Sequence, residues 1–130
     1  MRHIATVLFN LAGLVNLMPV VGVLGAARLE ALYGFPLAGD DLLLLMRHRA
    51  VLFGVLGAFI VVAAFRVQWR AIATIAGLIS MLSFVLLALP LDVHGEAVRR
   101  VFWVDVIASV LLLLGYWIST RHGSSREPGR

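Results

Sequence analysis

The sequence predicts an all-α protein built as a four-helix transmembrane bundle. Of its 130 residues, 62% are hydrophobic and 14% are charged, and the mean hydropathy is +1.00. A soluble domain keeps about a quarter of its residues charged. Four long apolar stretches, separated by short polar segments, account for the high share of hydrophobic residues. The lipid bilayer is therefore the expected solvent.

Each apolar stretch is long enough to cross a hydrocarbon core of about 30 Å at about 1.5 Å per helical residue. The predicted spans cover approximately residues 4–26, 42–65, 71–89 and 101–118. They form one membrane domain over residues 1–120, and the Gly, Ser, Pro and Arg composition of residues 121–130 predicts a disordered cytoplasmic tail.

The first span follows Arg2, as a signal peptide would, but its apolar run is longer than that of a signal and three more spans follow. An outer segment at 27–41 comes next, where Gly34 and Pro36 interrupt any helix. Asp40 or Asp41 is expected to cap the second span, and residues 66–70 form a tight inner turn before the third.

The arginines predict that both termini are cytoplasmic. All eleven basic residues are arginine. With both termini inside, more of the arginines near the ends of the spans lie on the cytoplasmic side than on the outer side, as the positive-inside rule requires. Those inside are Arg2, Arg66, Arg70, Arg121, Arg126 and Arg130, and those outside are Arg28, Arg99 and Arg100. The expected location is a bacterial cytoplasmic (inner) membrane, and arginine in place of lysine suggests a GC-rich genome.

Asp105 is the most informative polar residue. It lies about one turn inside the outer edge of the fourth span, where an unpaired carboxylate is costly. Helical geometry predicts that it faces the interior of the bundle, on one face with Ala108, Ser109, Leu112, Gly115, Tyr116 and Ser119. Small residues in the second helix form a stripe through Ala50, Gly54 and Ala58, and helical geometry extends it to Arg47. Arg47 is therefore the expected partner of Asp105, ahead of His48 and then of Arg49.

Asn16 in the first span and Ser83 in the third lie at a depth similar to that of Asp105, so an outward-opening polar pocket is expected. Three interpretations stay open. The pair can be a buried ion pair that fixes helix register, the cluster can bind a small ligand, a lipid headgroup or a quinone, or Asp105 can be hydrated or protonated.

A second cluster is the outer-loop sequence containing Asp92, His94 and Glu96. Carboxylate and imidazole groups are ligands for divalent cations, which makes this a metal-site hypothesis. The alternative is a solvated turn.

Several chemistries are excluded by what the sequence lacks. Without cysteine there is no disulfide, no thiol redox chemistry and no cysteine-ligated metal. Nucleotide-binding, zinc-protease and serine-hydrolase motifs are also missing, and the basic charge reflects membrane orientation rather than nucleic-acid binding.

The stretch from Leu45 to Gly54, LMRHRAVLFG, with Tyr33-Gly34 upstream, is similar to the DoxX-like group of small bacterial membrane proteins. The resemblance implies a four-helix inner-membrane protein that is sometimes the partner of a redox enzyme. The resemblance identifies no catalytic residue in this chain.

The first functional hypothesis is a non-enzymatic accessory or small-ligand-binding membrane protein without a bound cofactor. The alternative is a membrane-embedded enzyme or redox-enzyme subunit that acts on a lipophilic substrate such as a quinone or a lipid. A transporter, which four helices could form only as an oligomer, is a third class. The expected partners are the bilayer and either a second copy of the chain or a larger membrane complex.

Overall fold

The computed structural model describes residues 2–34, 36–91 and 95–121, and it confirms the all-α membrane fold. This part of the chain contains no strand, and four of its helical segments are long and apolar enough to cross a membrane. The elements are α1 (Arg2–Leu17), η1 (Met18–Leu24), α2 (Ala26–Tyr33), α3 (Asp40–Phe65), η2 (Val67–Trp69), α4 (Arg70–Ala88) and α5 (Glu96–Arg121).

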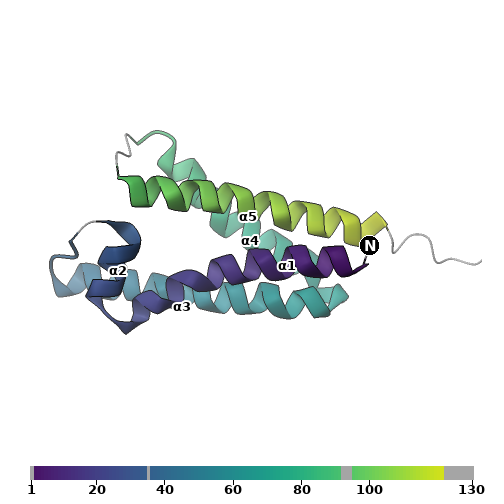
Figure 1. The fold of residues 1–130 in the computed structure, drawn as a ribbon, viewed down its shortest axis with the longest axis horizontal. Coiled ribbons are helices and arrows are strands. Elements are labelled where there is room, and N and C mark those ends of the chain that lie inside the picture. The colour runs from purple at the N-terminus through teal and green to yellow at the C-terminus, as the bar shows by residue number, and fades with distance from the viewer. Residues whose placement is uncertain (1, 35, 92–94, 122–130) are drawn as a thin grey trace, which may run out of the picture.

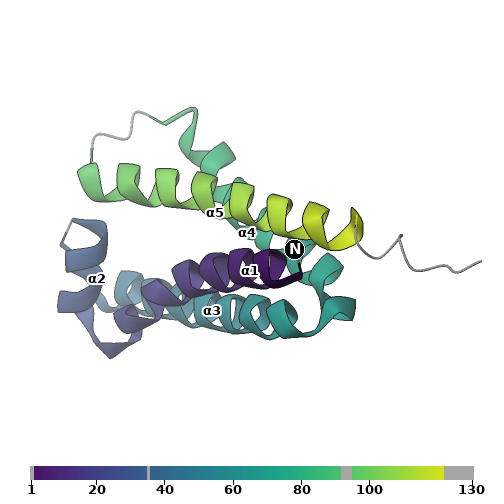
Figure 2. The same ribbon diagram turned by 45° about the vertical axis from the view of Figure 1, so that its right-hand side comes forward.

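The four long helices pack as a ring. Helix α1 contacts α3 and α5, and α4 contacts the same two helices from the other side. Figures 1 and 2 show α2 folded over one end of the bundle, with the amino-terminus and the last turn of α5 at the opposite end. We call these the α2 end and the η2 end.

The first predicted span is not one continuous α-helix. The α-helical part ends at Leu17, and the chain continues as a 3₁₀ helix that has Pro19 in its first turn. Proline lacks the N–H that an α-helix needs and its ring clashes with the preceding turn, which explains the change in pitch. The combined segment His3–Leu24 still has the length of a membrane span.

Helix α2 was not expected, because Gly34 and Pro36 were expected to interrupt any helix within the outer segment 27–41. The predicted break does occur at Gly34, whose φ of 74° ends α2 in the left-handed conformation that glycine tolerates. Gly39 rather than an aspartate is the N-cap residue of α3, and no side chain caps that helix. Asp40 and Asp41 follow in its first turn, where their charge still complements the helix dipole.

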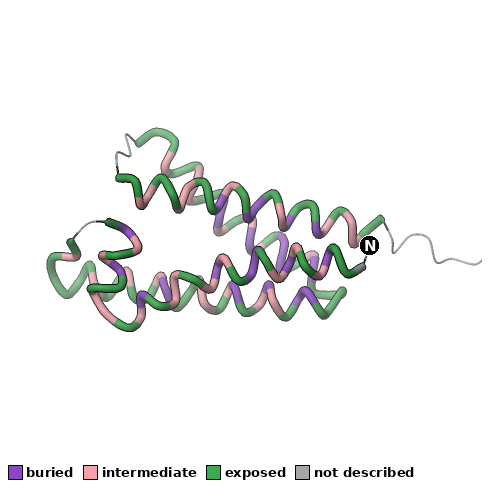
Figure 3. The backbone as a smooth tube through the Cα atoms, viewed as in Figure 1, coloured by how far each residue is buried: buried purple, intermediate pink, exposed green. Residues whose placement is uncertain are grey.

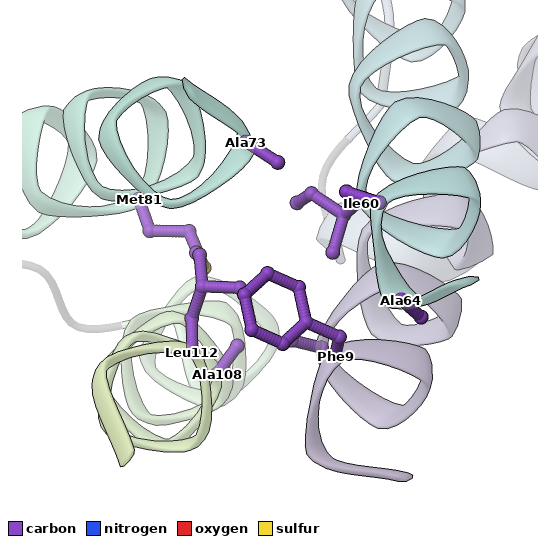
Figure 4. Packing of buried hydrophobic residues seen from close by; sticks show 9 residues of the cluster. Phe9, Ile60, Ala64, Ala73, Met81, Ala108 and Leu112 are labelled. Carbon is purple, nitrogen blue, oxygen red and sulfur yellow. The ribbon is translucent and has the colours of Figure 1, made fainter. Parts of the chain in front are cut away.

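The core lies between the four long helices near their middle, and the outward faces are exposed and apolar (Figure 3). Phe9 is fully buried and its ring lies among side chains from α3, α4 and α5, including Ile60, Met81 and Leu112 (Figure 4). Small residues bring the backbones together, because a Cβ at Gly57 would lie 2.8 Å from the carbonyl oxygen of Gly13. Close approach through small residues is how membrane helices associate.

Candidate functional site: a cavity at the α2 end

A cavity of about 190 Å³ lies at the α2 end, between η1, α2, α5 and the last turns of α1. The path of the chain creates it, because Gly25, with a φ of 150°, turns the chain from η1 into α2. Leu29 and Tyr33, one turn apart on α2, are both buried, and Leu29 packs against Gly22. The walls are mostly apolar: Val15, Met18, Pro19, Ala31, Leu32, Phe53, Ala97, Val101 and Val104.

The polar groups that line this cavity are few: Asn16, Tyr33, Arg100 and Asp105. An apolar pocket with a small number of placed polar groups is the usual form of a small-molecule site. The cavity is larger than the engineered cavities of about 150 Å³ that bind benzene in a protein core, so it has room for one substituted six-membered ring.

Asp105 is the residue that makes the cavity chemically distinctive. Helix α5 turns one face inward, as predicted, with Asp105, Ala108, Ser109, Leu112 and Gly115 all buried. Asp105 is 7% exposed, and its Oδ2 atom is buried without a hydrogen-bond partner among the described residues. Burying an acceptor unsatisfied costs about 1–3 kcal/mol, and more for a charged group. A ligand that donates a hydrogen bond here would relieve that cost.

Asn16, on α1, lines the same cavity, and two contacts hold its side chain in place. Its Nδ2 donates to the carbonyl oxygen of Ala12 at 3.0 Å and contacts Sδ of Met81 at 3.7 Å. The side chain is 4% exposed. This anchoring fixes where the amide lies in the wall of the cavity.

The arginine that interacts electrostatically with Asp105 is Arg49, not Arg47. The Arg49 guanidinium lies over three rings, with its Cζ 5.8 Å from the ring centre of Tyr33, 5.2 Å from that of Phe53 and 5.1 Å from that of Phe84. Cation–π attraction of this kind stabilises a partly desolvated arginine. Tyr33 itself is buried, and this burial raises the pKa of its hydroxyl above the ordinary value, while the charge of Arg49 acts in the opposite direction.

The structure brings together two of the five residues predicted to share the site. Asn16 and Asp105 line one cavity, whereas Ser83 lies in a separate groove between α3 and α4. Arg47 and His48 are both exposed. The expectation for Arg47 followed from a stripe through Ala58, but Ala58 is exposed and the inward face of α3 passes through Ala50, Gly57 and Ile60 instead. Because two residues correspond to about 200° of rotation, Arg49 and Arg47 lie on different faces of the helix.

The hypothesis of a metal site gains no support from the described residues. Asp92 and His94 lie outside them, and Glu96 is an exposed residue in the first turn of α5. Within residues 2–34, 36–91 and 95–121, no three histidine or acidic side chains are close enough to hold a metal ion.

Arg70, at the η2 end, was predicted only as a topology signal and proves to be a buried structural residue. It is 3% exposed and lies over the ring of Phe9, with its Cζ 5.4 Å from the ring centre. Its guanidinium donates to the carbonyl oxygens of Ala63 and Ala64 at 3.4 and 2.6 Å, to Oγ of Ser119 at 2.9 Å and to Oγ1 of Thr6 at 3.0 Å. The arginine thus joins α1, α4 and α5 to the last carbonyls of α3, where a cation complements the helix dipole.

A family model described as NADH-ubiquinone oxidoreductase chain 4, amino terminus, matches residues 49–120, more than half of the chain. The matched region includes Arg49, Arg70 and Asp105. Comparison with curated proteins and with solved structures gives no match. The expected membership of the DoxX-like group is therefore wrong: it depended on ten residues and a four-span layout, and apolar helices of this kind share both widely.

Proposed function

Because the chain belongs to the family of the amino-terminal region of NADH-ubiquinone oxidoreductase chain 4, we propose that it is a membrane subunit of a quinone-linked redox complex. In this proposal the cavity at the α2 end binds the ring of a quinone or quinol. The chain contributes a binding site and a membrane scaffold, and electrons come from other subunits of the complex.

The observation that carries the proposal is the unsatisfied Oδ2 of Asp105 in an otherwise apolar cavity. A quinol ring is apolar on both faces and carries two hydroxyl groups that donate hydrogen bonds. An ionised Asp105 is an acceptor only, so it fits the hydroxyl of the quinol better than the carbonyl of the oxidised quinone, which is also an acceptor. The proposal therefore includes a preference for the reduced ring at neutral pH.

Binding of a short-chain quinol to the detergent-purified protein tests this proposal, with equilibrium dialysis under reducing conditions as the measurement. A hydrogen bond to a charged group contributes about 1.5–3 kcal/mol, so Asp105→Leu is expected to weaken quinol binding by at least about tenfold. Asp105→Asn keeps the shape of the side chain and removes the charge, and it should reduce the preference for quinol over quinone.

The matched control is Asp41→Asn, which removes an exposed carboxylate at the same end of the bundle. It should leave quinol binding unchanged. Equal affinities of the unsubstituted protein, Asp105→Leu and Asp105→Asn for quinol would overturn the assignment of the site.

We further propose that the complex lies in a bacterial cytoplasmic membrane with both termini of this chain on the cytoplasmic side. The distribution of arginine along the sequence supports this orientation, because six arginines then fall on the cytoplasmic side and three on the outer side. Those inside are Arg2, Arg66, Arg70, Arg121, Arg126 and Arg130, and those outside are Arg28, Arg99 and Arg100. The α2-end cavity would then open toward the outer face.

A further inference from the structure

A second cavity, of about 370 Å³, forms a groove between α3 and α4. It is the more open of the two, and Phe53 is the one residue that lines both. The groove is lined by Arg49, Leu52, Phe53, Leu56, Ser80, Ser83, Phe84 and Leu87.

Arg49 provides the charge of this groove. It is half-buried, and among the described residues it makes ring contacts but no hydrogen bond or ion pair. Rings attract the guanidinium through their faces without occupying its N–H groups along their hydrogen-bonding directions. Its five N–H donors, arranged as a planar fork, are therefore available to an acceptor in the groove.

The depth of Arg49 suits the headgroup region of a bilayer. Its guanidinium lies over Phe84, and α4 ends four residues later at Ala88. Four residues of helix span about 6 Å, which an arginine side chain bridges by extending toward the interface. Ser83 lies at the same level, is exposed, and donates its hydroxyl to the carbonyl oxygen of Ser80 at 2.8 Å.

We propose that this groove binds an anionic phospholipid, with the lipid phosphate accepting hydrogen bonds from Arg49 and from the hydroxyl of Ser83. The Ser83 hydroxyl, which donates to the carbonyl oxygen of Ser80 in the structure, turns to the phosphate when the lipid binds, because a hydrogen bond to a charged acceptor is the stronger of the two. The planar fork of arginine matches two phosphate oxygens at once. Leu52, Leu56 and Leu87 line the groove and provide an apolar path for an acyl chain. Charge complementarity selects this occupant, because a neighbouring protein helix would have to bring a carboxylate into the bilayer to satisfy the same cation.

Native mass spectrometry of the detergent-purified protein, incubated with equal amounts of phosphatidylglycerol and phosphatidylcholine, tests the proposal. The unsubstituted protein should retain phosphatidylglycerol in preference. Arg49→Gln is expected to lower its retention about fivefold, the usual effect of one arginine on binding to an anionic lipid. Ser83→Ala, which changes an exposed residue and leaves the cation in place, should lower it by a smaller factor.

Arg47→Gln is the matched control, because Arg47 is an exposed arginine two residues away on the same helix. It should leave the preference for phosphatidylglycerol intact. An equal loss for Arg47→Gln and Arg49→Gln would assign the effect to general surface charge and overturn the proposal. Equal retention of the two lipids by the unsubstituted protein would also overturn it. Quinol binding, which depends on Asp105, should be the same in Arg47→Gln and in the unsubstituted protein.

Discussion

At the scale of single residues, three polar side chains organise the two ends of the bundle. Arg70 fixes the η2 end through hydrogen bonds to neutral acceptors, while Asp105 and Arg49 line two different cavities that share Phe53. Arg70 is enclosed by its own fold, whereas Asp105 and Arg49 each face a cavity. This difference separates Arg70, whose guanidinium donates within the fold, from Asp105 and Arg49, which line cavities.

Replacing Arg70 should destabilise the protein. Arg70→Gln removes donors that hold the carbonyls of Ala63 and Ala64, Oγ of Ser119 and Oγ1 of Thr6. Hydrogen bonds to charged groups contribute about 1.5–3 kcal/mol in proteins and somewhat less in membranes, so a loss of about 2–3 kcal/mol is expected. Unfolding in sodium dodecyl sulfate, followed by circular dichroism, measures it.

Arg66→Gln serves as the control for this experiment, since Arg66 is exposed at the same end of the bundle. Arg66→Gln should change the free energy of unfolding by no more than about 0.5 kcal/mol. If Arg70→Gln were as stable as Arg66→Gln, the role of Arg70 as a link between helices would be refuted.

The buried hydroxyl of Tyr33 should make the free energy of unfolding decrease at alkaline pH. Burial raises the pKa of its hydroxyl above the ordinary value of 10.0, so the unfolded chain loses this proton at a lower pH than the folded chain. The contribution of Tyr33 to the free energy of unfolding is fully present below about pH 10 and is lost as the pH rises through the raised pKa. Unfolding experiments between pH 9 and about pH 11.5 should show this decrease, and Tyr33→Phe should reduce it. An unchanged pH profile in Tyr33→Phe would count against the burial of the hydroxyl.

The sequence predicted Asp105 as an inward residue but ranked Arg49, the arginine that interacts with it, behind Arg47 and His48. Asp105 follows from helical geometry alone, because small residues follow it at helical spacing on the same face of α5. Choosing between Arg47 and Arg49 required knowing which of two small-residue faces of α3 turns inward. Both faces contain alanine and glycine, so the choice depends on contacts with α1 and η1 that no local pattern reveals.

At the scale of elements, close packing of α1 on α3 depends on glycine. A Cβ on Gly57 would lie within 2.9 Å of both the backbone nitrogen and the Cγ of Leu17, in addition to its short distance from Gly13. The backbone atoms cannot move aside without separating the two helices. Helices α3, α4 and α5 coincide with the apolar stretches 42–65, 71–89 and 101–118 to within a few residues at most ends, because length and apolarity determine where these helices form.

Gly57→Val should therefore weaken the contact between α1 and α3. Forcing extra carbon atoms into a packed interface costs about 1–3 kcal/mol, measurable by the same unfolding experiment. Ala58→Val adds an equally branched side chain at an exposed position of the same helix and should have little effect. Similar losses for both variants would show that β-branching in the helix, rather than the contact, is responsible.

The short elements were harder to predict than the long helices. The 3₁₀ segment and α2 lie where Pro19, Gly25 and Gly34 interrupt the apolar pattern. Pro19 and Gly25 fall inside the predicted first span of residues 4–26, and Gly34 was expected only to interrupt a helix. Helix α2 is too short to be stable alone. It forms because Leu29 and Tyr33 are buried against the bundle, which is a tertiary effect.

At the scale of the whole molecule, the orientation in the membrane decides which solution each end meets. The absence of cysteine makes single-cysteine labelling clean. With a membrane-impermeant maleimide on spheroplasts, Leu91→Cys at the α2 end should react in intact cells, and Arg66→Cys at the η2 end should react only after lysis. The reverse pattern would place the α2-end cavity on the cytoplasmic side and refute the predicted topology.

The proposal that the chain is a subunit of a quinone-linked redox complex is tested most directly by isolating it with its partners. The tagged chain, purified from membranes in a mild detergent, should carry with it NADH-to-quinone electron transfer that follows the chain through native electrophoresis. Asp105→Leu should assemble equally well, and the complex that contains it should bind quinol at least about tenfold more weakly. A chain that migrates alone, with the activity remaining in the unbound fraction, would contradict the account.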